Sequence, residues 1–281
     1  MSLQVLSLGA GVQSSTLALM SEYGELPRLD AAIFADTGAE PAAVYEWLEH
    51  LKEKLSYPVY TVSNGNLTVD SIKTVVGKRS GKRYINNGIP VFLRSKFRDG
   101  VFFRHCTNQY KIQPVQKKIR ELLSESGETV AEQWIGISID EAHRMKESRV
   151  ENITNIFPLI DLRMRRSDCL AWAEKKNMGK PPRSSCVYCP YNSDKKWLDL
   201  KNNDPQGWNV AVEFERKLQQ GFVEVVEARR AGEATPDLFA DTENPPIPYL
   251  HRKRIPLDQV ELDGEDQLDL FGEECEGMCG V

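Results

Sequence analysis

The chain has 281 residues, of which 41% are hydrophobic and 27% charged, a composition typical of a globular protein that can bury a sizeable core. The net charge of −5 identifies no partner by itself. No apolar run approaches the roughly 20 residues of a membrane-spanning helix, and the sequence enters a strand-like run directly after Met1. We therefore expect a cytoplasmic protein without a membrane partner.

The first sixty residues alternate between short apolar runs and helical patterns. Residues 3–8 predict a buried strand and residues 13–22 a helix. A second apolar run, "LDAAIFADTG", precedes the helical pattern "PAAVYEWLEHLKEKL", and "YPVYTV" predicts a third strand. This alternation is typical of parallel βαβ units, in which ligands bind beyond the carboxyl ends of the strands. We predict a doubly wound, mostly parallel, Rossmann-like α/β sheet.

The remaining sequence extends this domain and then changes character. Residues 64–105 are polar and basic without clear periodicity, which indicates a long insertion. "IQPVQKKIRELLSE" predicts a helix, "AEQWIGISI" a strand, and "NIFPLID" a short apolar run before a helix at about 166–177. We predict a binding domain over 1–192 with the insertion at about 64–105. A helical, partly irregular extension with an acidic, cysteine-bearing tail follows over 193–281.

The loop after the first predicted strand, in "VLSLGAGVQSS", has the composition of an anion site. Gly9 and Gly11 allow a tight backbone turn, and Ser14 and Ser15 follow where a helix exposes its N–H groups. The loop matches neither the Walker pattern nor G-x-G-x-x-G. A packing turn with helix-capping serines explains the loop equally well, so the loop alone does not decide between the two interpretations.

Five segments in order give the chain a family resemblance. They are "LGAGVQSS", "FADTGAEPAAVYEWLEHL", "CTNQYKIQPVQKKI", "WIGISIDEAHRM" and "IFPLIDL". Together they resemble the adenine-nucleotide α-hydrolase superfamily, in its branch of 3′-phosphoadenylyl-sulfate (PAPS) reductases and PP-loop ATP pyrophosphatases. The resemblance runs from residue 3 to about 192. Gly9, Gly11 and Ser14 match the pyrophosphatase loop and Val12-Gln13 the reductase loop, and Gln13 replaces the Asp of the pyrophosphatases.

The resemblance implies a site for ATP or for PAPS or its 3′-dephospho analogue APS. Lys111 and Arg144 match cationic positions of the family and are expected to stabilise negative charge on the transferred group. Asp140 and Glu141 are candidate Mg²⁺ ligands if the nucleotide is ATP. Alternatively, Asp36 is a helix cap and both cations are surface charges. The implied nucleotide-binding residues are Ser7, Gly9, Ala10, Gly11, Val12, Gln13, Ser14, Ser15, Asp36, Thr37, Gly38 and Gly136.

The chain has six cysteines, which in a cytosolic enzyme favour metal or redox roles over disulfides. Cys186 and Cys189 form a C-x-x-C pair that suits two ligands of one metal or cluster. The resemblance adds Cys106, which implies a [4Fe–4S] cluster with its fourth position open or closed by His105, Cys275 or Cys279. A zinc knuckle is the alternative. Cys169 has the pattern of a buried core thiol.

Two segments outside these motifs suggest partners. Glu274-Cys275 is similar to the mobile C-terminal Glu-Cys-Gly of the reductases, so Cys275 and Cys279 are candidate catalytic thiols, or members of a solvated tail. Between Lys73 and Arg104 nearly every charge is basic, with Tyr and Phe residues interleaved. That pattern suits a nucleic-acid strand, although the rings equally suit packing of the segment onto the sheet.

Three functions remain open at this point. The first is ATP-dependent activation of DNA or tRNA with release of pyrophosphate, followed by cluster-borne sulfur insertion. The second is a sulfonucleotide reductase that releases sulfite through a tail thiolate. The third is a non-catalytic accessory protein that binds nucleotide or nucleic acid. The enzymes would need a sulfur donor such as a cysteine desulfurase, or thioredoxin as reductant, and a homodimer is an open alternative.

Overall fold

The computed structural model describes residues 2–96 and 99–263 and divides them into two compact units. The first unit contains residues 2–64 and 107–185. The second contains the described residues of 65–106 and 186–263, so the basic segment belongs with the C-terminal helices. Each unit is described by itself. Within the described residues, no helix has both the length and the apolar character needed to cross a membrane.

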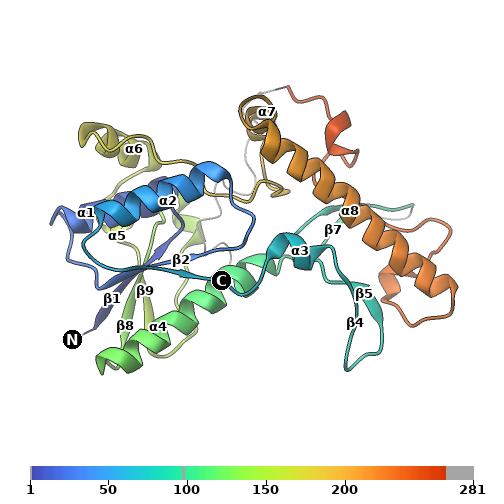
Figure 1. Cartoon of the computed structure of the whole chain (residues 1–281), viewed down its shortest axis with the longest axis horizontal. Helices are drawn as coiled ribbons and strands as arrows, with labels where there is room; N and C mark the ends of the chain where they lie inside the picture. Colours follow the sequence, from blue (N-terminus) through green and yellow to red (C-terminus); the bar gives the residue numbers. More distant parts are fainter. Residues whose placement is uncertain (1, 97–98, 264–281) are drawn as a thin grey trace. The chain divides into compact units, whose positions relative to one another are not determined.

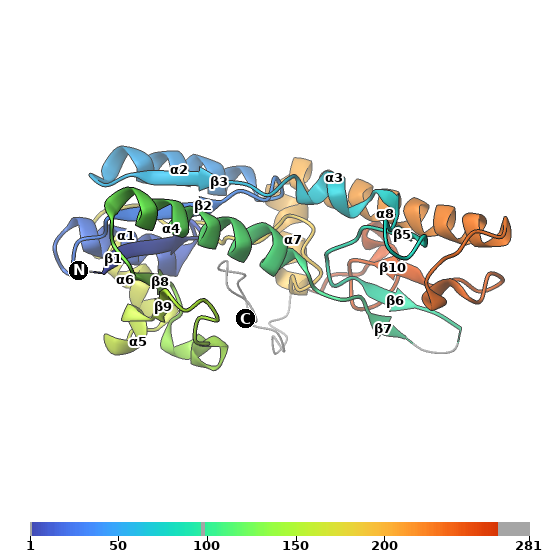
Figure 2. The same cartoon turned by 90° about the horizontal axis from the view of Figure 1, so that it is seen from below.

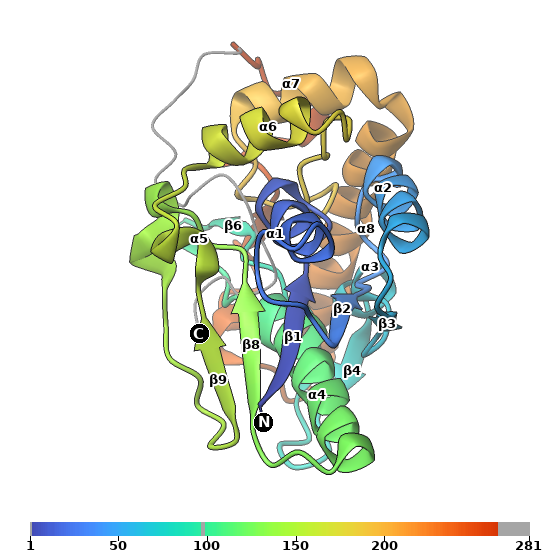
Figure 3. The same cartoon turned by 90° about the vertical axis from the view of Figure 1, so that its left-hand side faces the viewer.

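The first unit is built on a five-stranded, all-parallel sheet with the order β3-β2-β1-β8-β9 (Figure 3). In this register Val5 pairs with Ala31 on one side and with Gln133 on the other. The chain moves outward from β1 to β3 and then returns to the other side of β1, as in doubly wound folds. The predicted fold class is confirmed. The strands are β1 (Leu3–Leu8), β2 (Ala31–Ala35), β3 (Val59–Val62), β8 (Ala131–Ile135) and β9 (Ile153–Ile156).

Helices cover both faces of this sheet (Figure 1). Alternate strand residues point to opposite faces, so Leu6 and Phe34 pack under α1, α2 and α6, whereas Val5 and Ile33 pack under α4. α4 starts with a proline in its first turn and ends at Gly127, whose φ of 75° suits glycine. The helices are α1 (Val12–Glu22), α2 (Ala42–Lys54), α4 (Gln113–Ser126), α5 (Pro158–Asp161) and α6 (Arg166–Lys175).

The second unit consists of short strands packed along one long helix, α8 (Figure 2). β10, β6 and β7 form an antiparallel sheet, and β4 and β5 form a hairpin. α8 approaches β5 closely: a Cβ at Gly221 would lie 2.5 Å from Ile85 Cδ1. The elements are α3 (Leu67–Ser71), β4 (Thr74–Val76), β5 (Arg83–Ile85), β6 (Phe92–Arg94), β7 (Gly100–Val101), α7 (Asp194–Asn203), α8 (Pro205–Arg230) and β10 (Ile247–Tyr249).

Two buried carboxylates, one on α7 and one on α8, hold the segment 250–257 of the second unit through hydrogen bonds. Glu215 of α8 accepts hydrogen bonds from the backbone N–H groups of Leu250 and Leu257, each at 2.7 Å, and burial raises its pKa. Asp194 of α7 accepts from Arg252 and lies 3.2 Å from His251 Nε2. Burial lowers the pKa of His251. Burial alone would raise the pKa of Asp194, but hydrogen bonds from Arg252 and His251 hold it below its usual value.

Candidate functional site

The turn between β1 and α1 presents backbone N–H groups at the carboxyl edge of the sheet. Ala10 has a φ of 53°, a left-handed conformation that costs a non-glycine residue about 1 kcal/mol or more. Gly11 precedes the helix in an extended conformation and supplies no side-chain cap to the first helical N–H groups. Gly9 N–H donates to Ser14 Oγ at 3.2 Å. A strained turn before an uncapped helix start is an arrangement that suits an anion, as the sequence predicted for this loop.

The side chains of this loop point inward. Ser15 Oγ accepts a hydrogen bond from Trp47 Nε1 at 2.8 Å. Gln13 is fully buried, and its Nε2 donates to Glu141 Oε2 at 3.0 Å and to Ser138 Oγ at 3.3 Å. Gln13 Oε1 is buried without a hydrogen-bond partner among the described residues. Gln13, which stands in place of the pyrophosphatase Asp, therefore links the first loop to the loop after β8.

The loop after β2 contains a buried ion pair. Glu40 Oε1 lies 3.0 Å from Lys111 Nζ, and the side chains are 1% and 8% exposed. Thr37 Oγ1 contacts the same oxygen at 3.5 Å. Asp36 Oδ1 accepts hydrogen bonds from Gly38 N–H and Tyr45 OH, both at 2.8 Å. Asp36 thus stabilises the Asp-Thr-Gly turn, whereas Lys111 reaches the strand ends from a single π-helical turn, Thr107–Ile112.

The loop after β8 contains a second ion pair. After Gly136 the chain forms a 3₁₀ turn, Ile139–Arg144, in which Glu141 Oε1 contacts Arg144 Nη1. Both side chains are about one-tenth exposed. The neighbouring Asp140 accepts a hydrogen bond from Arg166 N–H at 3.2 Å, which ties it to the start of α6. Asp140 and Glu141, the predicted Mg²⁺ ligands, are thus both engaged by nitrogen donors.

The structure gathers most of the predicted site at one edge of the first unit. β1 lies between β2 and β8, so the loops that follow these three strands are neighbours. Ser7 is the last but one residue of β1, and the predicted cations Lys111 and Arg144 lie in segments that form ion pairs with Glu40 and Glu141. Sequence reasoning missed Glu40, Ser138 and the linking role of Gln13, because contacts between residues that are far apart in the chain leave no local pattern.

The predicted metal centre is not supported. Cys186 and Cys189 form a tight turn in which Cys189 N–H donates to Cys186 O at 3.0 Å, and Cys106 N–H donates to Gly88 O at 2.9 Å. Across residues 2–96 and 99–263, no three His, Cys, Asp or Glu side chains are placed to hold a metal ion. The described residues therefore give no support to a cluster or a zinc knuckle, with or without His105 as a ligand. Cys275 and Cys279 lie outside the described residues, whereas Cys169 is fully buried as expected.

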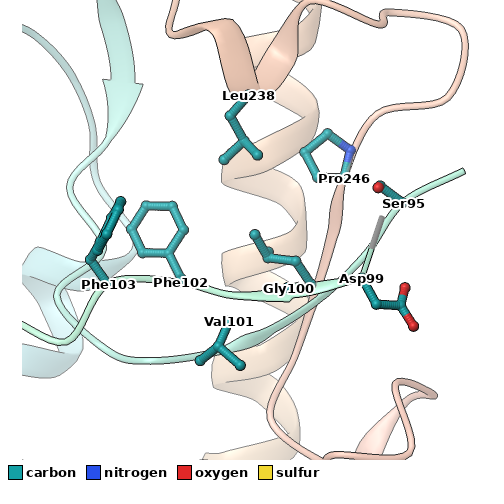
Figure 4. Close-up of a pocket in the computed structure, with 9 residues that line it drawn as sticks. Ser95, Asp99, Gly100, Val101, Phe102, Phe103, Leu238 and Pro246 are labelled. Atoms are coloured by element: carbon teal, nitrogen blue, oxygen red, sulfur yellow. The ribbon is translucent and has the colours of Figure 1, made fainter. Parts of the chain in front are cut away.

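A cavity of about 520 Å³ lies in the second unit and contains none of the predicted site residues. Figure 4 shows hairpin residues on one side of it and Leu238 and Pro246 on the other. Phe102 and Phe103, which are adjacent in the sequence, both line this cavity and are the sequence feature that could have indicated it. Its size is that of a small-molecule pocket, but its wall is largely apolar. The lining residues are Leu93, Ser95, Asp99, Gly100, Val101, Phe102, Phe103, Leu238 and Pro246.

The basic segment is partly engaged within the second unit. Arg83 pairs with Glu233 at 2.7 Å, and the guanidinium groups of Arg94 and Arg104 lie over the rings of Tyr249 and Tyr191. Some aromatics also pack inside the unit: Phe92 is buried and Phe102 contacts Phe222, whereas Phe103 is 77% exposed. Lys78 and Arg79 are exposed in the turn between β4 and β5.

Comparisons with solved structures include a distant structural neighbour. No protein-family model and no curated protein matches the chain. A crystal structure of a phosphoadenylyl-sulfate (PAPS) reductase from Candida auris, in complex with phosphate, resembles it with a TM-score of 0.39 and 12% sequence identity. The match covers 64% of this chain and 76% of that one. A likeness this distant assigns no family, so function must be inferred from the site residues.

Proposed function

We propose that the chain is an adenine-nucleotide-dependent enzyme of sulfur metabolism that acts on the phosphate or sulfate group of its nucleotide. The observation that carries this proposal is the uncapped N-terminus of α1 behind the Ala10 turn, at the same sheet edge as the Lys111 and Arg144 ion pairs. The five sequence segments that resemble PAPS reductases and ATP pyrophosphatases indicate that the ligand is an adenine nucleotide.

Each group has a defined role in this site. The N–H groups at the start of α1 bind the anionic group, helped by the positive end of the helix. Lys111 and Arg144 neutralise charge that builds on the transferred group. Gln13 is a positioning residue, because it holds the Glu141 carboxylate that contacts Arg144.

We place sulfonucleotide reduction first, because Glu274-Cys275 is similar to the C-terminal Glu-Cys-Gly segment of the reductases. The Cys275 thiolate attacks the sulfate sulfur, the bond from sulfur to the phosphate oxygen breaks, and the adenylate leaves. The Cys279 thiolate then attacks Cys275 Sγ, which releases sulfite and forms a disulfide. The two thiols supply both electrons, and a dithiol reductant such as thioredoxin regenerates them.

Sulfur insertion into nucleic acid is the second candidate, and the exposed Lys78 and Arg79 favour it. ATP would adenylate an oxygen of DNA or tRNA and release pyrophosphate. Sulfur from a donor such as a cysteine desulfurase would then displace AMP. Because the described residues do not fit a cluster, we assign no step to one.

One set of assays on anaerobically purified protein separates these functions. We expect sulfite from one of the two adenylyl sulfates, and its complete loss in Cys275→Ser. In Cys279→Ser we expect about one equivalent of adenylate per enzyme and no sulfite, because the first attack proceeds and the release step does not. Pyrophosphate release from ATP that DNA or tRNA stimulates would instead select sulfur insertion. Nucleotide binding without either activity would indicate an accessory protein, and no binding would contradict the proposal.

A further inference from the structure

Both cations of the candidate site already have a carboxylate partner within the chain. Lys111 Nζ lies 3.0 Å from Glu40 Oε1, and Arg144 contacts Glu141. All four side chains are at most about one-tenth exposed, so water screens these pairs only weakly. The formal charges of the four groups cancel. Seen without a ligand, the two pairs therefore give the sheet edge no net positive charge.

A nucleotide phosphate needs more positive charge than the rest of this edge supplies. The N-terminus of α1 contributes the equivalent of about half a charge. A terminal phosphate carries between one and two negative charges at neutral pH. A ligand oxygen that binds Lys111 or Arg144 therefore competes with the carboxylate that already neutralises that cation, and tight binding favours exchange of the carboxylate for the ligand. The exchange costs the desolvated carboxylate its best partner, so it lowers the affinity for every anion.

Two details indicate how the carboxylates can give way. Glu141 Oε2 accepts a hydrogen bond from Gln13 Nε2 at 3.0 Å, so the carboxylate keeps one partner when Arg144 leaves it. Glu40 Oε2 is buried without a hydrogen-bond partner among the described residues, so this group is only half satisfied in the ligand-free chain. Buried, unsatisfied carboxylate oxygens raise the free energy of the state that contains them.

We propose that Glu40 and Glu141 compete with the ligand for Lys111 and Arg144, and thereby select for ligands with several negative charges. A singly charged anion gains little by displacing a carboxylate of equal charge. A pyrophosphate or a doubly charged phosphate gains more, because its greater charge interacts more strongly with each cation than a single carboxylate does. This inference deepens the proposed function and rests on its assignment of an anion site at these loops.

The opposite assignment makes the opposite prediction. If Glu141 holds Mg²⁺ for a nucleotide, its removal weakens nucleotide binding. If Glu141 competes for Arg144, its removal strengthens binding, and the gain persists when Mg²⁺ is chelated. The sign of one affinity change thus separates the two roles.

The test is isothermal titration of pyrophosphate, AMP and adenosine, in the presence of EDTA, into wild-type protein, Glu141→Gln and Glu40→Gln. We expect about tenfold tighter binding of pyrophosphate in each variant, a smaller gain for AMP, and no change for adenosine, which carries no charge. The matched control is Glu25→Gln, which removes a carboxylate paired with Lys176 in the same unit and leaves the strand-end loops intact.

A mutant cycle excludes an indirect structural effect. In the Arg144→Leu background, Glu141→Gln should no longer improve pyrophosphate binding, because the contested cation is gone. Glu40→Gln leaves Lys111 without its buried partner and lowers the melting temperature of the free protein. If this variant is too unstable to titrate, its melting-temperature rise with pyrophosphate is measured instead and should exceed that of the wild type.

The outcomes distinguish failure of this inference from failure of the proposed function. Wild-type binding of AMP with unchanged or weaker binding in both variants overturns the competition but leaves the nucleotide site. Tighter pyrophosphate binding, with no affinity for AMP above that for adenosine in any protein, supports the competition and contradicts the nucleotide assignment. Binding of no probe by any protein overturns both.

Discussion

The two units use buried carboxylates for different purposes. In the first unit, Glu40 and Glu141 pair with side-chain cations at the ends of parallel strands, beside a strained turn. In the second unit, Glu215 accepts two backbone N–H groups and holds the C-terminal segment to α8. Backbone N–H groups are fixed, so a carboxylate that accepts from them keeps its partners when a ligand binds. A side-chain cation can rotate away from its carboxylate and bind the ligand instead. The comparison therefore predicts that the first unit's ion pairs affect both stability and ligand binding, whereas Glu215 in the second unit affects stability alone.

The largest effect is expected at Lys111. Lys111→Met should weaken pyrophosphate binding about 100-fold and lower the free energy of unfolding by about 3–5 kcal/mol, because it leaves Glu40 buried without its cation. The double variant Lys111→Met/Glu40→Gln should regain most of the stability and none of the binding. Titration and denaturant unfolding measure the two quantities. Restored binding in the double variant would contradict a role for Lys111 in the site.

A comparable loss of stability alone is expected at Glu215. Glu215→Ala leaves the N–H groups of Leu250 and Leu257 without their acceptor and should lower the free energy of unfolding by about 3 kcal/mol. Pyrophosphate affinity per folded molecule should not change. The control, Glu213→Ala on the same helix, removes an exposed pair with Lys217 and should have no measurable effect. Equal melting curves for the two variants would refute the anchoring role.

The pH dependence of stability should report on buried ionisable groups of the second unit. Burial lowers the pKa of His251, so its contribution to stability is present above the ordinary value of 6.5 and is lost as the pH falls through the folded-state pKa. The pKa of Asp194 is also lowered, so its contribution to stability is likewise lost as the pH falls, but at more acidic pH, below the ordinary value of 3.8. Glu215, with a raised pKa, contributes in the opposite sense, since its contribution is lost as the pH rises.

Melting curves between pH 7.5 and 5.5 test the His251 contribution. We expect the stability of the wild type to fall with pH across this window, and the fall to be shallower in His251→Gln. His105→Gln is the matched control, because His105 is exposed in the same unit. Parallel pH profiles for His251→Gln and the wild type would show that His251 does not cause the loss of stability at lower pH.

The smallest effect is expected at the strained turn. Ala10→Gly relieves a left-handed conformation at φ 53° but adds conformational entropy to the unfolded chain, so the free energy of unfolding should rise by no more than about 1 kcal/mol. Pyrophosphate affinity should stay within about twofold, because the N–H groups of the turn remain. Clear destabilisation would mean that packing of the Ala10 methyl group contributes more to stability than the left-handed backbone costs.

The sequence predicted the first unit better than the second, for physical reasons. The strand Leu3–Leu8 is a six-residue, largely apolar run, and a glycine-bearing turn and a helix of 11 residues follow it, so the element and its end are visible in the sequence. β4 to β7 have two or three residues each, which is too short to display a period of two. β4 and β5 pack against α8, and β6 and β7 pair in one sheet with β10, arrangements that only the folded chain brings about.

The position of the strand-end loops could be predicted from the sequence, whereas the contacts between these loops could not. Glycines, serines and the Asp-Thr-Gly turn are local signals, and they located the strand-end loops correctly. The pair Glu40–Lys111 and the contact of Gln13 with Glu141 join residues that are far apart in the chain, so no spacing reveals them. The expected cluster shows the reverse error: a C-x-x-C spacing together with Cys106 matched a pattern, yet the described residues do not assemble a metal site.

A crystal structure of the chain with AMP tests the central claim most directly. We predict that the phosphate lies against the N–H groups at the start of α1, within hydrogen-bond distance of Arg144 or Lys111, with Glu141 or Glu40 turned away from that cation. AMP bound instead in the apolar cavity of the second unit, with both ion pairs of the first unit intact, would contradict the account.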